Sequence, residues 1–571
     1  MIYLGIHNSW QSGAALIVNG KVVGAVSEER FNRIKNFHGM PTQSISFLLS
    51  EQNLKINDVD RVVYGMVTAV EPNEGVLKKI IKTIIEGCIK NPSIKEKYFE
   101  RVNAEMLWNK KHLDEIKGWV TENKLEEKFY LIDHHYSHAA GAYYSSPFNN
   151  CLTFTSDGKG NYKSAGIYRG TKSFLEELDY LTTFDSLGYF YGNITSALGF
   201  KAERHEGKVT GLAAYGKKTK FQKVTDSIFE LKNGSFQSCL GKYYLPWFCK
   251  KSDLPSLFDE VKKYNKEDIA YATQKTLENV TCYWIESAIK KYNSNRLTDI
   301  CLSGGIFANV RLNQKIMELD KVKNIFVMPA MGDMGIPLGS CFAQMVKDKK
   351  PFKRFIPSMS LGPSFSDKYI ENLLKKNKSR FSRIKDKKSV MLKCLRENKV
   401  IGFFNGKMEY GPRALCNRSI IVGTSDKNIN DWLNKRMNRT EFMPFAPVMR
   451  KEIANQFIKD YKSDDVTLNF MTSTVNCTDQ FKENNPAVVH IDKTARPQIV
   501  TKESNNFIWN VLLQWENITN ENSLVNTSFN IHEEPIICDI DEGMESLNKG
   551  VIDQLWFIDG DNVYIYSQNE I

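Results

Sequence analysis

Three of the nine histidines in this chain fall within five residues, in the segment Asp133–Ala140. His134 and His138 are four residues apart, so on a helix they would share one face. Nineteen residues after His138, Asp157 ends a strand-like run, and Asp333 lies in a later Gly-Asp-Met-Gly turn. A fold that brings these carboxylates to the helix face builds an open divalent-metal site. The alternative is that the two histidines only pack in a core or cap the helix.

Length and composition indicate a folded protein with more than one domain. The chain has 571 residues, enough for two domains or three, and its hydrophobic content of 42% suffices for large cores. It carries 77 basic and 66 acidic residues, which gives a net charge of +11. This excess permits a phosphate-rich ligand or a nucleic acid as a partner, and it does not by itself require either.

The cysteines indicate a reducing compartment. There are 11 of them and no two are spaced as Cys-x-x-Cys, which disfavours a zinc ribbon or an iron–sulfur cluster. The N-terminus reads as a first strand and not as a signal peptide. No apolar run reaches the roughly 18 residues needed to span a bilayer. We therefore expect a cytoplasmic protein with no membrane partner.

Local patterns place the main elements. Asn19-Gly20 between two apolar runs is a strong β-hairpin signal, and a hairpin after a glycine-containing turn also opens the actin-like ATPase fold. Residues 41–49 predict the start of a helix, and the lysine-rich stretch 76–117 predicts a solvated helical insertion. The basic, proline-containing stretch 348–363 predicts a domain junction, followed by a second α/β region.

A glycine turn follows one of the later strands. Strand 300–302 leads into Ser303-Gly304-Gly305, with Asn309 shortly after. This motif resembles the adenosine and phosphate turn of actin-like ATPases, because glycine lets backbone amides approach a phosphate that a Cβ would block. The motif is weak alone and gains weight from the Gly-Asp-Met-Gly turn about one strand later.

Further motifs extend along nearly the whole chain. In the first half they are Glu28-Glu29-Arg30-Phe31-x-Arg33-x-Lys35, Asp133-His134-His135-x-x-His138-Ala139, Ser156-Asp157-Gly158, Lys208-Val209-x-Gly211-Leu212-Ala213 and Leu302-Ser303-Gly304-Gly305. In the second half they are Met408-Glu409-x-Gly411-Pro412-Arg413-Ala414-Leu415-x-Asn417-Arg418-Ser419, Pro444-Phe445-Ala446-Pro447, His490-x-Asp492-x-Thr494-Ala495-Arg496, Asn526-Thr527-Ser528-Phe529-Asn530 and Glu534-Pro535-Ile536. In this order they resemble the ATP-dependent O-carbamoyltransferases of nodulation-factor, cephamycin and aminoglycoside biosynthesis.

The resemblance implies an α/β protein of two domains. Residues 1–350 would form an actin-like ATPase domain with ribonuclease-H-like halves, like the tRNA threonylcarbamoyl-transfer proteins, and would hold a divalent metal such as Fe²⁺. Residues 360–571 would form an α/β domain like the threonylcarbamoyl-adenylate synthases. There carbamoyl phosphate and ATP, with Mg²⁺, would give carbamoyl-adenylate and pyrophosphate. The first domain would then pass the carbamoyl group to an acceptor hydroxyl and release AMP.

The resemblance also implies roles for individual residues. Those expected to act in the transfer are His134, His138, Asp157 and Lys35, with Asp333 as a fourth metal ligand. Those expected to bind ATP or carbamoyl phosphate are Ser303, Gly304, Gly305, Asn309, Lys407, Arg413, Arg418, Arg439, His490, Arg496, Asn526 and Ser528. Arginine suits phosphate because its planar fork binds two oxygens at once. Each arginine alone could instead form a surface ion pair, and His490 could be a core histidine.

The chain departs from the family pattern near the acceptor. Relatives carry His-Asp before the first hairpin, where this chain has Trp10-Gln11. In the second half, this chain has Thr440 and Met443 where relatives have Glu and Arg, which puts the carbamoyl-phosphate contacts there in doubt. An indole beside the acceptor favours stacking on a base over a small sugar, unless Trp10 packs in the core. The segment Lys242–Lys251 interleaves aromatics with lysines, as single-strand binding surfaces do, or else is a buried strand edge.

Several alternatives for the function stay open at this point. We favour a hydroxymethyl pyrimidine in DNA or RNA, such as 5-hydroxymethylcytosine, as the acceptor over a hydroxyl of a small natural product or sugar. A tRNA threonylcarbamoyladenosine enzyme and a non-catalytic nucleotide-binding regulator are less favoured. The partners expected are ATP, carbamoyl phosphate and, with lower weight, a nucleic acid and a second copy in a homodimer.

Overall fold

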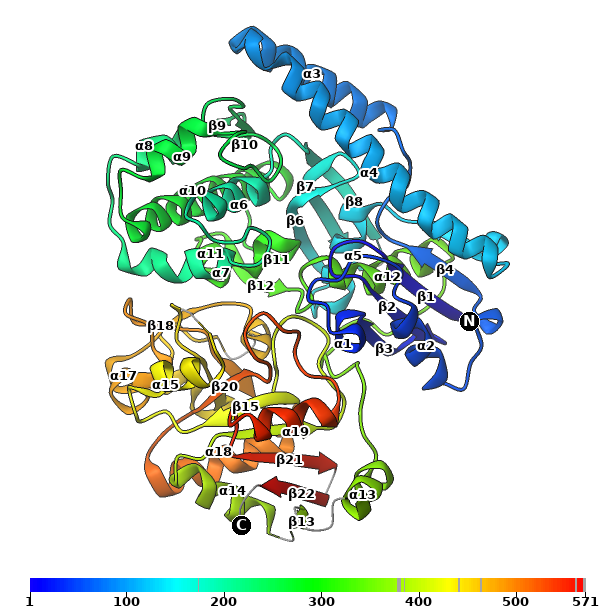
Figure 1. Ribbon diagram of the computed structural model, residues 1–571. Helices are drawn as coiled ribbons and strands as arrows, with labels where there is room; N and C mark the ends of the chain where they lie inside the picture. Colours follow the sequence, from blue (N-terminus) through cyan, green and yellow to red (C-terminus); the bar gives the residue numbers. More distant parts are fainter. Residues whose placement is uncertain are drawn as a thin grey trace. The chain divides into compact units, whose positions relative to one another are not determined.

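The computed structural model of the chain describes residues 1–172, 174–376, 381–384, 386–439, 442–462, 465–559 and 562–567. Contacts divide the chain into two compact units (Figure 1). The first unit contains residues 1–23 and 38–355, and the second contains residues 24–37 and 356–571. The change of unit at residue 355 lies inside the junction expected from the sequence. Segment 24–37, which the expected division at 350–360 assigns to the first domain, groups with the second unit.

Two arginines explain why segment 24–37 belongs to the second unit. Arg33 donates hydrogen bonds of 2.9 Å to the backbone carbonyls of Pro535 and Ile536 and pairs with the carboxylate of Glu542. Arg30 is buried and donates to the carbonyl of Gly411 at 3.0 Å. The Glu-Glu-Arg-Phe-x-Arg motif therefore braces turns that lie several hundred residues away in the sequence.

The first unit contains two five-stranded sheets with the same connectivity. The first has the order β3-β2-β1-β4-β5 and the second the order β12-β11-β6-β7-β8. In each, the first strand pairs antiparallel with the second strand and parallel with the fourth. The strands are β1 (Ile2–His7), β2 (Gly13–Val18), β3 (Lys21–Ser27), β4 (Arg61–Tyr64), β5 (Phe129–Leu131), β6 (Asn150–Gly160), β7 (Lys163–Thr171), β8 (Phe174–Thr182), β11 (Thr298–Ser303) and β12 (Val322–Val327). This repetition confirms the two ribonuclease-H-like halves expected for an actin-like fold.

The predicted hairpin joins β2 to β3. Asn19 and Gly20 have φ angles of 50° and 77°, and two consecutive positive φ angles are what a two-residue type I′ turn requires. Asparagine and glycine are the residues that adopt this conformation at least cost, so the local sequence determines the turn.

Two helices cross between the sheets and carry the candidate site. Helix α5 (His134–Ser145) packs on β6 and β11, and helix α12 (Ile336–Lys347) packs on β1 and β4. They approach so closely that a Cβ on Gly339 would lie 2.0 Å from the carbonyl oxygen of Ser137. Glycine at this crossing therefore holds the start of α5 beside the start of α12.

The predicted insertion is a pair of long helices between β4 and β5. Helix α3 (Glu74–Lys90) and helix α4 (Lys95–Glu122) confirm the helical interpretation of this stretch. Five of its lysines pair with carboxylates, namely Lys78, Lys79, Lys82, Lys90 and Lys97. The other elements of the first unit are α2 (Thr42–Ser50), α6 (Leu187–Ala197), α7 (Glu206–Leu212), α8 (Gln222–Asp226), β9 (Phe229–Lys232), β10 (Ser235–Ser238), α9 (Pro255–Val261), α10 (Lys266–Tyr292) and α11 (Val310–Met317).

The second unit is built on one mixed sheet of eight strands, in the order β13-β22-β21-β14-β15-β20-β16-β19. Its strands are β13 (Phe381–Arg383), β14 (Ile401–Asn405), β15 (Arg418–Val422), β16 (Ala446–Arg450), β19 (Gln498–Val500), β20 (Leu524–Ser528), β21 (Gln554–Asp559) and β22 (Asn562–Ser567). Ile420 and Ile421 of β15 point into two separate apolar cores, as side chains on opposite faces of a strand must. Apolar side chains on both faces mean that both faces are covered.

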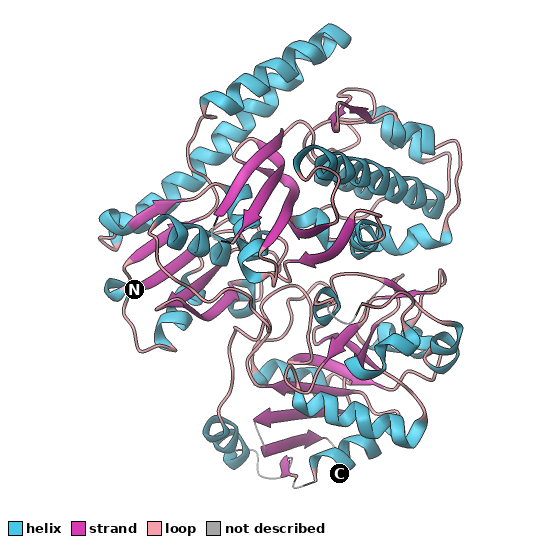
Figure 2. Cartoon of the chain, turned by 180° about the vertical axis from the view of Figure 1, so that it is seen from behind, coloured by secondary structure: helices cyan, strands magenta, loops and turns pink. Residues whose placement is uncertain are grey.

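Helices cover this sheet and complete the unit. They are α1 (Glu29–Asn32), α13 (Asp367–Lys376), α14 (Lys387–Arg396), α15 (Ile429–Arg436), α16 (Ala454–Phe457), α17 (Asp479–Asn484), α18 (Asn506–Thr519) and α19 (Ile540–Asn548), and a small ribbon pairs β17 (Val475–Asn476) with β18 (Thr494–Ala495). Figure 2 shows helices and strands mixed in both units, which confirms the α/β class. In the described part of the chain, no helix has both the length and the apolar character that a membrane crossing needs.

Candidate functional site

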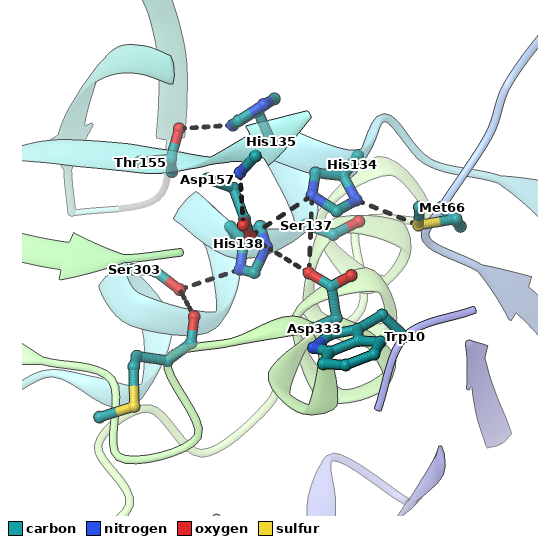
Figure 3. Close-up of polar contacts among 12 residues, drawn as sticks. Trp10, Met66, His134, His135, Ser137, His138, Thr155, Asp157, Ser303 and Asp333 are labelled. Atoms are coloured by element: carbon teal, nitrogen blue, oxygen red, sulfur yellow. Dashed lines mark hydrogen bonds and ion pairs between the residues drawn. The ribbon is translucent and has the colours of Figure 1, made fainter. Parts of the chain in front are cut away.

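Helix α5 presents two of its three histidines to one site. Asp133 caps the helix by accepting a hydrogen bond from the backbone N–H of Tyr136 at 3.0 Å. His134 and His138 then lie one turn apart, with ring centroids separated by 4.7 Å. His135 points elsewhere and its Nδ1 meets the hydroxyl of Thr155 at 3.0 Å, which makes it a structural residue of the core (Figure 3).

The structure brings the four expected metal ligands together. The Nε2 atom of His138 lies 3.3 Å from a carboxylate oxygen of Asp157 and 3.3 Å from one of Asp333. The Nε2 atom of His134 lies 3.9 Å and 3.8 Å from the same two oxygens. All four ligand atoms lie within 4.8 Å of one another (Figure 3). Strand β6 delivers Asp157, and the turn that precedes α12 delivers Asp333.

The ligand atoms fit a divalent cation. The Nε2 atoms of His134 and His138 and one oxygen of Asp157 are buried and have no hydrogen-bond partner among the described residues. Buried polar atoms without partners are rare, and three that converge on one point indicate a missing ion. Ligand atoms about 2.1 Å from a bound cation lie roughly 3 to 3.5 Å apart, close to the shorter distances here. Two imidazoles and two carboxylates suit iron, zinc or manganese.

The charges in the cluster also favour a cation. Burial lowers the pKa of His134 well below its usual value, so this imidazole is neutral and can act as a ligand. Burial also lowers the pKa of His138, but its two carboxylate neighbours outweigh that effect and raise it to about 9. Burial and the charge of Asp157 raise the pKa of Asp333 to about 7. Two carboxylates buried side by side require positive charge, which a divalent cation supplies.

The glycine turn after β11 supports the metal ligands. The hydroxyl of Ser303 lies 3.1 Å from Nδ1 of His138 and can thereby fix the tautomer that leaves Nε2 free for a metal. Gly304 has a φ of 105°, and a Cβ on it would lie 2.2 Å from the carbonyl oxygen of Ser156. A Cβ on Gly305 would lie 3.1 Å from Asp157. The turn expected to bind the nucleotide thus lies against the metal cluster.

Asn309 has a structural role in addition to the one expected. Its side-chain oxygen caps α11 by accepting from the N–H of Leu312 at 3.0 Å. Its side-chain amide donates to Gln274 at 2.8 Å and to Thr210 at 3.3 Å. These contacts fix the orientation of Asn309, and a nucleotide would have to bind to this fixed amide.

The two acceptor candidates lie next to the cluster. The carbonyl of Trp10 meets Nε2 of His7 at 2.9 Å, and that nitrogen lies 3.6 Å from Asp333. Figure 3 draws Trp10 and Asp333 in the same view, and the ring contact of the indole is with His38, edge-on at 5.1 Å between centroids. Gln11 has a φ of 58°. Its side-chain oxygen packs against Gly332, so that a Cβ on Gly332 would lie only 2.5 Å from it. Trp10 is half-buried, so it does not pack fully into the core.

Sequence reasoning missed a second indole near the cluster. Trp108 of α4 lies under the ammonium of Lys159, which is 3.8 Å from the ring centroid. Lys159 is two residues beyond Asp157 on β6, and burial lowers its pKa to about 7. His112 lies against Trp108 at 4.4 Å between centroids. The insertion therefore reaches the metal cluster, which the sequence shows only as a solvated helix.

The lysine and aromatic segment 242–251 is mainly part of the core. Tyr244 is fully buried, and its hydroxyl donates to the carbonyls of Phe184 and Ser186 at 3.1 Å and 3.0 Å. Leu245 and Cys249 are buried as well. These contacts support the structural alternative for this segment over a nucleic-acid surface.

Arg418 of the second unit is a brace. Its side chain is fully buried, and its guanidinium donates to the carbonyls of Gly406, Asn417 and Pro363 at 2.9–3.0 Å. It also lies over the ring of Phe404 at 4.7 Å. Burial lowers its pKa to about 10. This arrangement favours a structural role over the phosphate contact expected for Arg418.

Glu409 orders the turn that follows it. Its buried carboxylate accepts from the backbone N–H groups of Leu415 at 2.6 Å and Arg418 at 3.3 Å. Gly411 in this turn has a φ of 132°, which glycine tolerates. The turn holds Arg413, which is half-buried. The signal that could have identified Glu409 is its place two residues before Gly411-Pro412-Arg413.

Two other expected contacts lie at the end of β20. Arg439 donates to the hydroxyls of Thr527 and Ser528, both at 3.0 Å, and to the side chain of Asn530 at 2.7 Å. The buried amide of Asn526 donates to the carbonyl of Ala414 at 3.1 Å. Arg439, Ser528 and Asn526 therefore lie around the turn that carries Arg413.

The remaining expected residues are dispersed. Lys407 is exposed, Arg496 is half-buried, and His490 is buried with Nδ1 3.5 Å from Asp492. Lys35 is half-buried in segment 24–37 of the second unit and is not a member of the metal cluster. Met443 is half-buried, and Thr440 lies outside the described residues.

The solved structures that match part of this chain are distant in sequence and have low TM-scores. Full-length HypF in its phosphate- and nucleotide-bound form is 13% identical, with a TM-score of 0.34, over 61% of this chain and 55% of that one. Component A of (R)-2-hydroxyglutaryl-CoA dehydratase from Acidaminococcus fermentans is 15% identical, also with a TM-score of 0.34, over 61% of this chain and 99% of that one.

Relatives in sequence match over most of their length. The uncharacterized protein MJ1051 of Methanocaldococcus jannaschii is 31% identical over 97% of this chain and 98% of its own. Nodulation protein NolNO of Sinorhizobium fredii is 28% identical over 92% of this chain and 75% of its own. Residues 3–342 match the family model for the carbamoyltransferase N-terminus, and residues 392–562 match the model for the carbamoyltransferase C-terminus. The chain therefore belongs to the carbamoyltransferase family and is an enzyme of that class.

Proposed function

We propose that this carbamoyltransferase uses carbamoyl phosphate and ATP in two stages, at two sites. In the second unit, water cleaves the bond between the carbamoyl group and phosphate in carbamoyl phosphate, phosphate leaves, and the resulting carbamate attacks the α-phosphorus of ATP. The bond to pyrophosphate breaks, and carbamoyl-adenylate forms. In the first unit an acceptor hydroxyl attacks the carbamoyl carbon, loses its proton, and displaces AMP. The four-ligand cluster is the observation that carries this proposal, because it needs a cation and lies in the unit that would perform the transfer.

The first unit supports the transfer stage. His134, His138, Asp157 and Asp333 would hold the divalent metal, for which we propose Fe²⁺ or a similar ion. When bound, such an ion supplies a Lewis acid that can bind phosphate oxygen and polarise a carbonyl. Ser303 lies at Nδ1 of His138, and the glycines after it let the turn pack closely against Ser156 and Asp157. The adenylate phosphate and its carbonyl would bind there.

The second unit supports the adenylating stage. Phosphate transfer needs positive charge and ordered donors around the moving group. The turn that carries Arg413 is held by two hydrogen bonds: the N–H of Leu415 donates to Glu409, and the amide of Asn526 donates to the carbonyl of Ala414. Arg439 lies beside it with Ser528. We therefore assign phosphate contacts to Arg413 and Arg439. Lys407 and Arg496 would supply further positive charge, and His490, which belongs to the same sequence motif as Arg496, is a further candidate. Mg²⁺ would accompany ATP.

For the acceptor we propose a hydroxymethyl pyrimidine in DNA or RNA, such as 5-hydroxymethylcytosine. The carbonyl of Trp10 meets Nε2 of His7, which lies 3.6 Å from Asp333, and an indole near the reacting group can stack on a flat base. Trp108 adds a second aromatic ring, which lies against the amine of Lys159, two residues beyond Asp157 on β6. Most of the lysines in the insertion already pair with carboxylates, so the support for a base comes from the two indoles.

The experiment that tests the function follows products in one reaction. Purified chain, ATP, Mg²⁺, Fe²⁺ and carbamoyl phosphate are mixed with a single-stranded oligonucleotide that contains 5-hydroxymethylcytosine. We expect pyrophosphate release that depends on carbamoyl phosphate, and nucleosides that have gained one carbamoyl group in mass spectrometry. Pyrophosphate release without a carbamoylated nucleoside from any hydroxymethylated DNA or RNA would assign the acceptor to the small molecules. No release of pyrophosphate would contradict the adenylating stage itself.

A further inference from the structure

An exposed ridge of aliphatic side chains runs along helix α3. The ridge consists of Leu77, Ile81, Ile85 and Ile89, which are 42, 47, 55 and 77% exposed. The adjacent side of the helix buries Val76 and Ile80 in the core of the first unit. Residues four apart form one continuous ridge on a helix, and large apolar residues clustered on an exposed surface mark an interaction site. We call these four residues the α3 ridge.

Charged residues follow the ridge with the same spacing. Glu74, Lys78, Lys82, Glu86 and Lys90 recur every four residues beside it. Lys78 pairs with Glu74 at 2.5 Å and Lys82 with Glu86 at 3.8 Å, and both lysine side chains are more than 70% exposed. Exposed pairs of this kind contribute at most about 1 kcal/mol, so they can exchange partners at little cost.

In an antiparallel pair of α3 helices, most of these charged residues would face a residue of opposite charge on the other helix. If a second α3 runs antiparallel and the pair is centred near Lys82, Lys78 faces Glu86 of the other copy, and Glu74 faces Lys90, which also pairs with Glu230 of its own copy. Only Lys82 faces a like charge. The aliphatic residues pair in a neighbouring register. When the antiparallel pair is centred at Thr83 and not at Lys82, Leu77 lies against Ile89 and Ile81 against Ile85. A surface that matches itself on reversal is what a two-fold interface requires.

We propose that two copies of this chain form a two-fold dimer through antiparallel packing of their α3 ridges. Ridges of residues four apart pack into each other's grooves with helix axes crossing at about 50°. The charge pattern favours a second copy over an anionic membrane surface, because Glu74 and Glu86 would lie against the lipid headgroups. The dimer does not depend on the carbamoyl transfer proposed above, so either proposal can fail without the other.

The first test measures mass in solution with the full chain. We expect sedimentation equilibrium at micromolar concentration to give a mass near twice the 65.5 kDa of one chain. Ile85→Glu should weaken the dimer by more than tenfold in dissociation constant, because it places a charge at the centre of the apolar contact. Ile85 is 55% exposed, so the variant should fold, which a thermal melt checks. Ile518→Glu, at a residue of α18 that is 48% exposed, is the control that should leave the dimer intact.

The second test examines the antiparallel register. Lys78→Glu and Glu86→Lys should each weaken the dimer several-fold, and the two changes together should restore it, since they exchange the charges across the interface. A monomeric wild type at micromolar concentration would overturn the proposal, as would a dimer that Ile85→Glu leaves unchanged. A monomer that binds vesicles containing anionic phospholipid through the ridge would also overturn it and assign the ridge to a membrane surface.

Discussion

At the scale of single residues, the candidate site rests on atoms that lack a partner. Nε2 of His134, Nε2 of His138 and one oxygen of Asp157 are buried at one point without hydrogen bonds among the described residues. His135, between them in the sequence, has its hydrogen bond to Thr155. Nε2 of His135 also lacks a hydrogen bond, but only the Nε2 atoms of His134 and His138 lie with Asp157 and Asp333 within 4.8 Å of one another, which distinguishes the candidate ligands from His135.

His138→Ala should therefore reduce metal binding by more than roughly tenfold, because it removes one of four ligands while the helix remains. Metal content after loading with Fe²⁺ and gel filtration measures this directly. His135→Asn is the matched control, since it changes a buried histidine of the same helix that faces Thr155. Equal metal content in His138→Ala and the wild type would show that the cluster is only a network of ion pairs.

Trp10→Ala should weaken binding of the 5-hydroxymethylcytosine oligonucleotide by roughly 1–3 kcal/mol, the usual loss for a stacking aromatic. Trp10→Phe should recover part of it because a flat ring remains. Fluorescence anisotropy measures the affinity, and Trp509→Ala in the second unit serves as the control. Unchanged affinity in Trp10→Ala would remove the base-stacking role.

Arg418 and Arg413 should respond differently to substitution, although they lie in the same motif. Arg418→Ala removes a buried donor from three carbonyls, of which those of Asn417 and Pro363 keep the N–H groups of Asn405 and Met408, and it opens a cavity, so unfolding should become easier by roughly 3–5 kcal/mol. Arg413→Ala should leave stability nearly unchanged and abolish pyrophosphate release that depends on carbamoyl phosphate. Denaturant unfolding and a pyrophosphate assay compare the two variants. Normal ATP turnover in Arg413→Ala would make this arginine structural as well.

At the scale of elements, the crossing of α5 and α12 positions the metal ligands. The approach at Gly339 leaves no space for a methyl group, since a Cβ would lie 2.0 Å from the Ser137 carbonyl. This crossing brings together the start of α5, which carries the histidines, and the turn that carries Asp333.

Gly339→Ala should accordingly push the two helices apart and destabilise the fold by roughly 1–3 kcal/mol. Gly118→Ala on α4 is the matched control, because a Cβ there meets nothing within 4 Å. Alanine should make that exposed helix position more stable by up to about 1 kcal/mol. Thermal unfolding of both variants measures the difference. Equal stability of the two variants would contradict the close-packed crossing.

Sequence patterns predicted these elements where the determinants are local. The Asn19-Gly20 turn, the helix with His134 and His138, and the strand that ends at Asp157 follow from neighbours within a few residues. The roles of Arg33 and Arg418 could not be predicted in this way. Arg33 donates to carbonyls about 500 residues away, and Arg418 to a carbonyl 55 residues away, and neither partner has a sequence signal.

At the scale of the whole molecule, the proposed function divides the chemistry between two units. The first has two sheets of the same connectivity and carries the metal cluster, and the second has one mixed sheet and carries the arginine turn. Segment 24–37 shows that the division is not a single cut in the sequence, because its arginines bind turns of the second unit. The family models match residues of both regions, 3–342 and 392–562.

The most direct measurement of the two-site account compares both stages in His138→Ala and in the wild type. Pyrophosphate release from ATP on addition of carbamoyl phosphate reports the first stage, and carbamoylated nucleoside reports the second. The account predicts that the variant releases pyrophosphate at a rate comparable to the wild type and forms no carbamoylated product, because the metal cluster serves only the transfer. Equal loss of both stages in a folded variant would contradict it.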